Sequence, residues 1–196
     1  MPKLTSRLAA AFLALSLAAC SQAPAPPPPL EGASIGGPFE LVDSQGKIVR
    51  WSDFDGKWRM VYFGYAYCPD VCPFDVQRMM QGYEAFKRAE PELAAQTVPI
   101  FITIDPERDT PEVVGEFTGN FSDDLVGLTG TPEQVDRAAK AFSVYYAKGE
   151  VTQNGGYMMD HSNAAYLMDR DGNPVALLSV DTSGEAVAAE LAQWIR

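Results

Sequence analysis

Soft metal ligands are scarce in this chain. Its 196 residues include a single histidine, His161, and three cysteines. Cys20 belongs to an N-terminal segment of different composition, so Cys68, Cys72 and His161 remain for the body of the protein. A structural zinc site normally has four protein ligands, and this set provides three unless a carboxylate completes it. Metal or redox chemistry is therefore restricted to one small group of residues.

Positive charge is also scarce. The chain holds 15 Lys and Arg residues against 26 Asp and Glu residues, which gives a formal net charge of −11. Nucleic-acid affinity depends on cationic side chains that neutralise phosphates, so we expect no nucleic-acid partner. The acidity suits a cationic partner surface or a metal cation, and it also favours solubility on its own.

The apolar stretch at residues 9–17 is too short to be a convincing membrane span. It follows Lys3 and Arg7 and ends in Leu-Ala-Ala-Cys, a pattern that resembles a bacterial lipobox. We therefore predict a lipoprotein signal peptide at residues 1–19 and lipidation of Cys20. The alternative is an ordinary secretory signal with a chance cysteine. Acyl chains would anchor the protein to the periplasmic side of a bacterial membrane, for which the inner membrane is the preferred assignment.

Residues 20–35 are rich in proline, which favours an extended polyproline II conformation and provides no core. At about 3.1 Å per residue, such a tether would hold a domain up to roughly 50 Å from the membrane. The length of the remaining segment, residues 36–196, predicts a single domain.

Buried strands alternate with amphipathic helices along this domain. Two hairpins are expected at residues 38–51 and 164–180, and three strands between them at 58–65, 97–104 and 125–128. Four helices are expected: at residues 73–89, beginning at 111, beginning at 132, and at 184–195. A polar loop is expected at residues 148–157. This order predicts a thioredoxin-like three-layer α/β/α domain with a mixed central sheet and an N-terminal β-hairpin. Cysteines between the first central strand and its helix occupy the place of the redox site in such folds.

The spacing of Cys68 and Cys72 allows two kinds of chemistry. Residues at i and i+4 of a helix have Cα atoms roughly 6 Å apart, within the range that a disulfide tolerates. The same spacing lets both sulfurs bind one metal ion, and a helix N-terminus favours thiolates. An exported protein meets an oxidising compartment, but so short a closed loop adds little stability. The pair is therefore expected to have a redox or ligand role.

A site formed by Cys68, Cys72 and His161 would suit copper, since thiolates favour Cu(I) and imidazole binds copper and zinc alike. The spacing alone does not exclude zinc. A lone histidine is more often a packed side chain than a ligand. His161 comes just before a predicted strand at the sheet edge next to the cysteine loop, which favours the ligand hypothesis.

Three motifs make the resemblance to a known family specific. They are GYAYCPDVCP at residues 64–73, TIDPERDT at 103–110 and DHSNAAYL at 160–167. Together they resemble the Sco/SenC family of thioredoxin-like copper chaperones, and the resemblance covers residues 36–196. It implies a tethered protein that helps to load the binuclear copper (CuA) site of cytochrome c oxidase. Many members are anchored by a transmembrane helix, so the lipid anchor predicted here is a departure.

Carried over residue by residue, the resemblance implies Cys68, Cys72 and His161 as ligands of copper, as Cu(I) and alternatively Cu(II). It implies two partners, the copper-site subunit of cytochrome c oxidase and a periplasmic copper donor. A binding protein is preferred to an enzyme. The alternatives are a thiol–disulfide reductase, in which Cys68 and Cys72 keep the target's cysteines reduced, and a peroxide-removing or redox-sensing relative.

Five neighbouring residues are weaker candidates. Asp105 and Asp109 either order the loop beside the site or cap turns, and Asp160 either supports the metal ligands or contacts a partner. Met158 and Met159 either act as soft auxiliary ligands or fill the core.

Overall fold

The computed structural model describes residues 26–151 and 156–196. The predicted signal peptide and Cys20 lie outside these residues. No helix in the described part of the chain is long and apolar enough to cross a bilayer.

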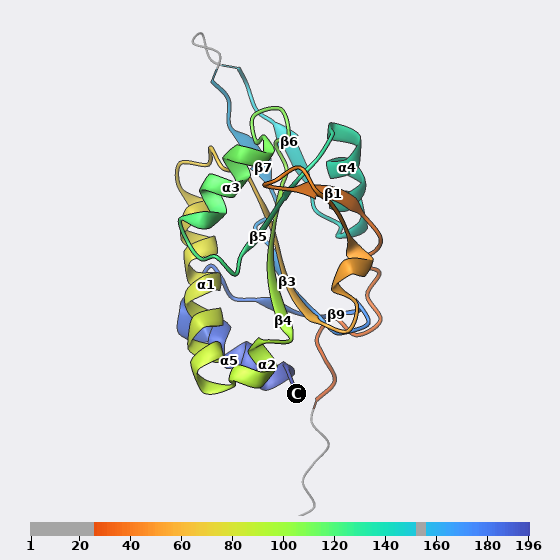
Figure 1. Cartoon of the computed structure of the whole chain (residues 1–196), viewed down its shortest axis with the longest axis vertical. Coiled ribbons are helices and arrows are strands. Elements are labelled where there is room, and N and C mark those ends of the chain that lie inside the picture. Colours follow the sequence, from red (N-terminus) through yellow and green to blue (C-terminus); the bar gives the residue numbers. More distant parts are fainter. Residues whose placement is uncertain (1–25, 152–155) are drawn as a thin grey trace, which may run out of the picture.

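The described residues form a central sheet flanked by helices (Figure 1). The strands are β1 (Glu40–Asp43), β2 (Ile48–Arg50), β3 (Trp58–Gly64), β4 (Thr97–Thr103), β5 (Val126–Thr129), β6 (Tyr146–Lys148), β7 (Met159–His161), β8 (Ala165–Met168) and β9 (Pro174–Leu178). The helices are the 3₁₀-helix η1 (Trp51–Phe54) and the α-helices α1 (Val71–Ala89), α2 (Pro91–Ala94), α3 (Pro111–Gly119), α4 (Pro132–Ala141) and α5 (Gly184–Trp194).

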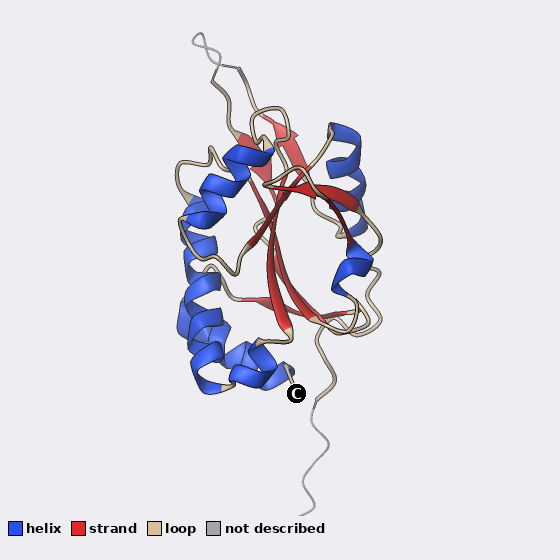
Figure 2. Cartoon of the chain, viewed as in Figure 1, coloured by secondary structure: helices blue, strands red, loops and turns tan. Residues whose placement is uncertain are grey.

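Seven strands build the main sheet in the order β2-β1-β5-β4-β3-β8-β9. The three central strands β3, β4 and β5 run parallel, and the strands on either side pair antiparallel. Helices α1, α3 and α5 lie on one side of the sheet and α4 lies on the other (Figure 2). The predicted three-layer domain with a mixed sheet and an N-terminal hairpin, β1 and β2, is therefore confirmed.

The central strands form where the sequence is apolar on both faces. In β3 all residues after Trp58 are buried, and in β4 only Val98 is partly exposed. Helices begin at the predicted caps, since the hydroxyl of Thr110 accepts a hydrogen bond from the Val113 amide and Thr131 forms a capping box with Gln134.

The predicted loop at residues 148–157 is only part of a longer excursion from the main sheet. Strands β6 and β7 on its two sides pair with each other as a separate two-stranded sheet. His161 is thus inside a strand, and the strand predicted to follow it at once is β8. Strands of three residues are too short for an alternating pattern to be visible in the sequence. The helices η1 and α2, each of four residues, were missed for the same reason.

Part of the segment predicted as a tether lies along the domain. The Leu30 amide donates a hydrogen bond to the Val175 carbonyl at 3.1 Å, and the Gly36 amide donates to the Ala141 carbonyl at 2.8 Å. Leu30 and Ile35 pack against the core. Gly36 has a φ of 95°, and a Cβ there would lie 2.6 Å from the Met168 methyl group, so this position requires glycine.

Candidate metal centre

The end of β3 and the start of α1 position the two cysteines. We call residues 64–73 the thiol arm. Cys72 is fully buried in the first turn of α1, and Cys68 is partly buried just before the helix. A Cβ at Gly64 would lie 3.2 Å from the Cys72 sulfur and 2.8 Å from the Tyr62 ring, so glycine leaves room for the thiol. Both cysteines are free thiols.

The helix N-terminus acts on the sulfur of Cys68. The Cys72 amide, which has no partner within the helix, donates a hydrogen bond to the Cys68 Sγ at 3.3 Å. The pKa of Cys68 is lowered mainly because its thiolate accepts a hydrogen bond from the Cys72 thiol, with a smaller contribution from His161. The same bond and burial raise the pKa of Cys72. Cys68 is therefore the more reactive thiol of the pair.

His161 reaches the cysteine pair from β7. Its Nε2 lies 3.3 Å from the Cys72 Sγ, and its Nδ1 lies 3.0 Å from the Ser162 carbonyl oxygen. A carbonyl can only accept, so Nδ1 carries the proton in this contact. Nε2 is then unprotonated, and its lone pair faces the sulfur. A metal-binding imidazole has this tautomer and this orientation. We call β7 and the segment leading into it, residues 156–161, the imidazole arm.

The distances fit a shared ion after a small adjustment. Zinc-like bonds of about 2.3 Å to sulfur and 2.0 Å to nitrogen place the two atoms about 3.5–3.7 Å apart at tetrahedral or trigonal angles. The Cys72–His161 separation of 3.3 Å is close to this range. Within residues 26–151 and 156–196, however, no three His, Cys, Asp or Glu side chains are already assembled around one point. The predicted ligands converge, and Cys68, whose sulfur faces the Cys72 amide, is the one that has to reorient.

Two further residues, Tyr62 and Asp75, form a chain of contacts that begins at the Cys72 thiol. The Tyr62 hydroxyl interacts with the Cys72 thiol and donates a hydrogen bond to the Asp75 Oδ2 at 3.0 Å. Asp75 is almost fully buried, and this burial raises the pKa of its carboxyl group. The sequence analysis missed both residues, although an acid three positions after a cysteine on the inner face of a helix was a usable signal.

The weaker candidates differ in burial and in hydrogen bonding. Asp105 and Asp109 are buried and order the loop after β4, and the Asp109 Oδ2 accepts a hydrogen bond from the Ala66 amide of the thiol arm at 2.8 Å. Asp160 is exposed, and its side chain forms no hydrogen bond or ion pair with the described residues. Met159 is buried in the core.

Met158 lies at the edge of the site. Its side chain is half exposed, and its sulfur is 3.9 Å from the Tyr65 hydroxyl. The Tyr65 ring in turn meets the His161 ring edge to face, with centroids 5.9 Å apart. Tyr65 thus lies between the exposed thioether and the imidazole, and it was not singled out from the sequence.

The chain is similar in sequence to known proteins over most of its length. The model of the SCO1/SenC family matches residues 27–196. The chain belongs to this family. SenC of Rhodobacter capsulatus is 42% identical over 159 residues, covering 80% of this chain and 68% of SenC. The SCO1 homolog of human mitochondria is 38% identical over 164 residues, covering 83% of this chain and 53% of that protein.

Solved structures agree with the family assignment. The crystal structure of Arabidopsis thaliana ScoI with copper bound matches with a TM-score of 0.74 and 35% identity, covering 81% of this chain and 96% of that one. The chain spans about half the length of the mitochondrial relatives it matches. The predicted family and the thioredoxin-like fold are confirmed.

Proposed function

We propose that this SCO1/SenC protein binds one copper ion through Cys68, Cys72 and His161 and delivers it to the CuA site of cytochrome c oxidase. The copper is cargo, so the site has to bind it and also release it. The relative ScoI was solved with copper bound, which supports copper as the ion. The copper-site subunit of the oxidase would be the recipient and a periplasmic copper donor the source.

One observation carries the proposal. The imidazole of His161, with its Nδ1 proton held by the Ser162 carbonyl, directs Nε2 at the Cys72 sulfur from 3.3 Å. A dithiol that only exchanges disulfides needs Cys68 and Cys72 and does not require a third donor atom. A copper site needs this third donor, because two thiolates alone leave a Cu(II) ion under-coordinated.

The oxidation state of the pair would control release. Reduced Cys68 and Cys72 bind copper as thiolates, and their oxidation to a disulfide removes both sulfur ligands. We further propose that lipidation of Cys20 tethers the domain to the periplasmic side of a bacterial membrane. Conversion of Cys20 to Ala should then release the protein from the membrane fraction or leave it unprocessed, and a wild-type protein found wholly in the soluble fraction would contradict the anchor.

Copper titration of the reduced protein tests the site. We expect one copper per chain, sulfur-to-copper charge-transfer absorption with Cu(II), and no tight binding after Cys68 and Cys72 are oxidised. Cys68→Ser and Cys72→Ser should each abolish tight binding. His161→Ala should weaken binding strongly while the cysteine pair still oxidises and reduces reversibly. Asp123→Asn, an exposed change between α3 and β5, is the matched control and should bind as the wild type does.

Cellular oxidase activity separates delivery from reduction. A chaperone with His161→Ala should lose oxidase activity, and added copper should partly restore it. If His161→Ala binds copper with unchanged affinity, the proposed three-residue site is wrong. If the variant binds poorly and the cell keeps full oxidase activity, delivery through this site is wrong, and a thiol reductase would explain the cysteine pair.

A further inference from the structure

The imidazole arm lies outside the hydrogen-bonded network of the main sheet. Among the described residues, β7 pairs with β6 alone. The thiol arm, by contrast, continues directly from β3 at the centre of the seven-stranded sheet. Side-chain contacts therefore help to fix the distance between His161 and Cys72. Besides the contacts of Tyr65 with Met158 and His161, a second group of contacts joins the two arms.

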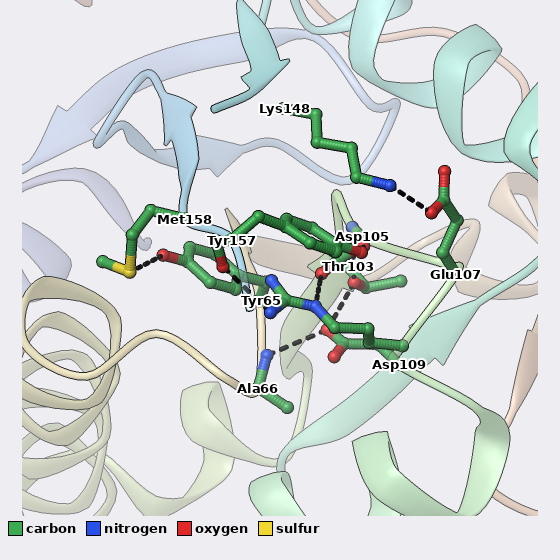
Figure 3. A network of polar contacts seen from close by, with 10 residues as sticks. Tyr65, Ala66, Thr103, Asp105, Glu107, Asp109, Lys148, Tyr157 and Met158 are labelled. Carbon is green, nitrogen blue, oxygen red and sulfur yellow. Dashed lines mark hydrogen bonds and ion pairs between the residues drawn. The ribbon is translucent and has the colours of Figure 1, made fainter. Parts of the chain in front are cut away.

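Three side chains form a closed set of contacts, which we call the clasp: Asp105, Arg108 and Tyr157. The Arg108 Nη1 donates a hydrogen bond to the Tyr157 carbonyl at 2.9 Å, and its Nε donates to the Asp105 carboxylate. The Tyr157 hydroxyl donates to the other oxygen of Asp105 at 2.8 Å. The guanidinium carbon lies 3.6 Å from the centre of the Tyr157 ring. Figure 3 shows the Tyr157 ring extending toward Asp105 within this network.

The base of the clasp is rigid because the loop after β4 is tied down. The Thr103 hydroxyl donates to Asp109 at 2.6 Å and accepts from the Asp105 amide at 2.9 Å. Asp109 also accepts the amide of Ala66, as Figure 3 shows, so the loop and the thiol arm are bonded to each other. A side chain that reaches from this loop to residue 157 thus connects the imidazole arm to the thiol arm.

Arg108 contacts the thiol arm directly as well. Its guanidinium carbon lies 5.3 Å from the centre of the Tyr67 ring and 5.7 Å from that of Tyr65. Tyr67 precedes Cys68, and Tyr65 packs against His161. One planar cation therefore lies among three tyrosines that flank the proposed ligands. Lysine could keep the charge at this position, but it could not provide the fork of donors or the flat stacking surface.

We infer that Arg108 is a positioning residue for His161: through the clasp it holds residue 157, four positions before the histidine, and thereby keeps the imidazole against Cys72. This inference rests on the proposed copper site. The clasp bonds Tyr157 through its backbone carbonyl, its ring and its hydroxyl, which leaves this residue little freedom to shift. Partners of this kind around metal ligands typically change metal affinity by 10–100-fold when they are removed.

Copper affinity measured in a double-mutant cycle tests the inference. We expect Arg108→Ala to lower the affinity of the reduced protein for Cu(I) by 10–100-fold, and Arg108→Lys to restore only part of it. In a His161→Ala background, Arg108→Ala should have little further effect, because the ligand that it positions is gone. An unchanged affinity in Arg108→Ala, or a full additional loss in the double variant, would overturn the inference.

The matched control is Lys148→Gln. The Lys148 ammonium also lies over the Tyr157 ring, at 4.1 Å, and pairs with Glu107, but among the described residues this side chain forms no hydrogen bond with the backbone of the imidazole arm. Its removal should change the affinity less than twofold, and a loss equal to that of Arg108→Ala would mean that charge near Tyr157, rather than the clasp, is responsible. Tyr157→Phe removes only the bond to Asp105 and provides a second test, with a smaller loss expected, if Arg108→Ala fails to fold.

A metal-free readout separates this inference from the proposed function. In the reduced apoprotein, nuclear Overhauser contacts between the His161 ring and the Cys72 Hβ protons report the distance that the clasp sets. Arg108→Ala should weaken these contacts, and Lys148→Gln should leave them intact. If the wild type binds no copper, the proposed function fails and the apoprotein contacts still decide on Arg108. If the contacts persist in Arg108→Ala, the positioning role is wrong.

Discussion

The thiol arm continues from β3 in the middle of the seven-stranded sheet, whereas the imidazole arm ends in a three-residue strand paired with β6. Around the thiol arm the contacts are buried and dense: Gly64 lies against Tyr62, Phe101 and Cys72. The imidazole arm holds one core residue, Met159, and its other contacts include side-chain bonds nearer the surface, such as those of Arg108 and Ser162.

This difference has a functional meaning. The proposed delivery of copper requires the ligands to come together for binding and to separate for release, and the structure concentrates that freedom on one side. The cysteine pair shares the stability of the core, while His161 depends on a few contacts whose loss leaves the core intact. Local opening of the imidazole arm is therefore expected to need much less free energy than any movement of Cys72.

The largest effect on stability is expected from the core beneath the thiol arm. Phe63 is fully buried in β3, and its ring centroid lies 5.3 Å from that of Phe142. Phe63→Ala should lower the free energy of unfolding by about 3–5 kcal/mol, since such truncations leave a cavity. Chemical denaturation followed by circular dichroism measures the loss.

An aromatic residue beside the imidazole arm is the control. Tyr145, just before β6, is 63% exposed, and its truncation to Ala should change stability by no more than about 0.5 kcal/mol. If Tyr145→Ala were as damaging as Phe63→Ala, the two arms would belong to one cooperative unit, and the contrast between them would be wrong.

The sequence predicted the thiol arm better than the imidazole arm for the same physical reason. Strand β3 and helix α1 are long and strongly patterned, so periodicity predicted that Cys68 and Cys72 lie at their junction. The helix begins at Val71, two residues before its predicted start, and therefore includes Cys72. His161 was a candidate as the only histidine of the chain and from its place before a predicted strand, and the family resemblance then implied it as a ligand. Its own strand has three residues, and the pairing with β6 depends on contacts between distant parts of the chain that leave no local pattern.

The contacts of the clasp also could not be predicted from the sequence. Arg108 was visible in the motif at residues 103–110, where it lies between acids, but its bond to Tyr157 joins positions 49 apart in the sequence. A tyrosine in a polar loop carries no signal of such a contact. Asp105 and Asp109 were candidates from the sequence as residues that either order the loop beside the site or cap turns. Their roles as loop anchors required the structure.

A pH-dependent effect is expected from Asp109, which anchors the thiol arm. Burial raises the pKa of its carboxyl group to about 6 from an ordinary value of 3.8. The folded protein then holds this proton more tightly than the unfolded chain does. The associated stability is complete below pH 3.8 and is lost as the pH rises through 6, and it amounts to roughly 3 kcal/mol.

Asp109→Asn removes this titration while keeping the contacts of the thiol arm. The Asp109 Oδ2 accepts both the Ala66 amide and the Thr103 hydroxyl, and Oδ1 has no hydrogen-bond partner in the described residues, so an Asn oxygen can replace Oδ2. Denaturation at pH 4 and pH 7 should show a smaller stability difference in the variant than in the wild type. Asp123→Asn, at an exposed position between α3 and β5, should leave that difference unchanged. Equal pH dependence in the wild type and Asp109→Asn would contradict the assignment.

The smallest effect is expected from Ser162, which follows the imidazole arm. Its hydroxyl accepts a hydrogen bond from the exposed Tyr145 amide at 3.2 Å, while its own amide donates to the Tyr145 carbonyl at 2.9 Å. Ser162→Ala removes only the first bond, and water can replace it at the amide. The free energy of unfolding should therefore fall by about 1 kcal/mol or less. The Ser162 carbonyl still accepts the Nδ1 proton of His161, so copper affinity should stay within about twofold, a shift of roughly 0.4 kcal/mol. Hydrogen exchange is the sharper measurement, because amides of β6 and β7 should exchange faster in the variant while those of β3 and β4 keep their protection. Faster exchange in β3 as well would show that the hairpin and the central sheet open together, and His161 would then have no independent freedom to release its ligand.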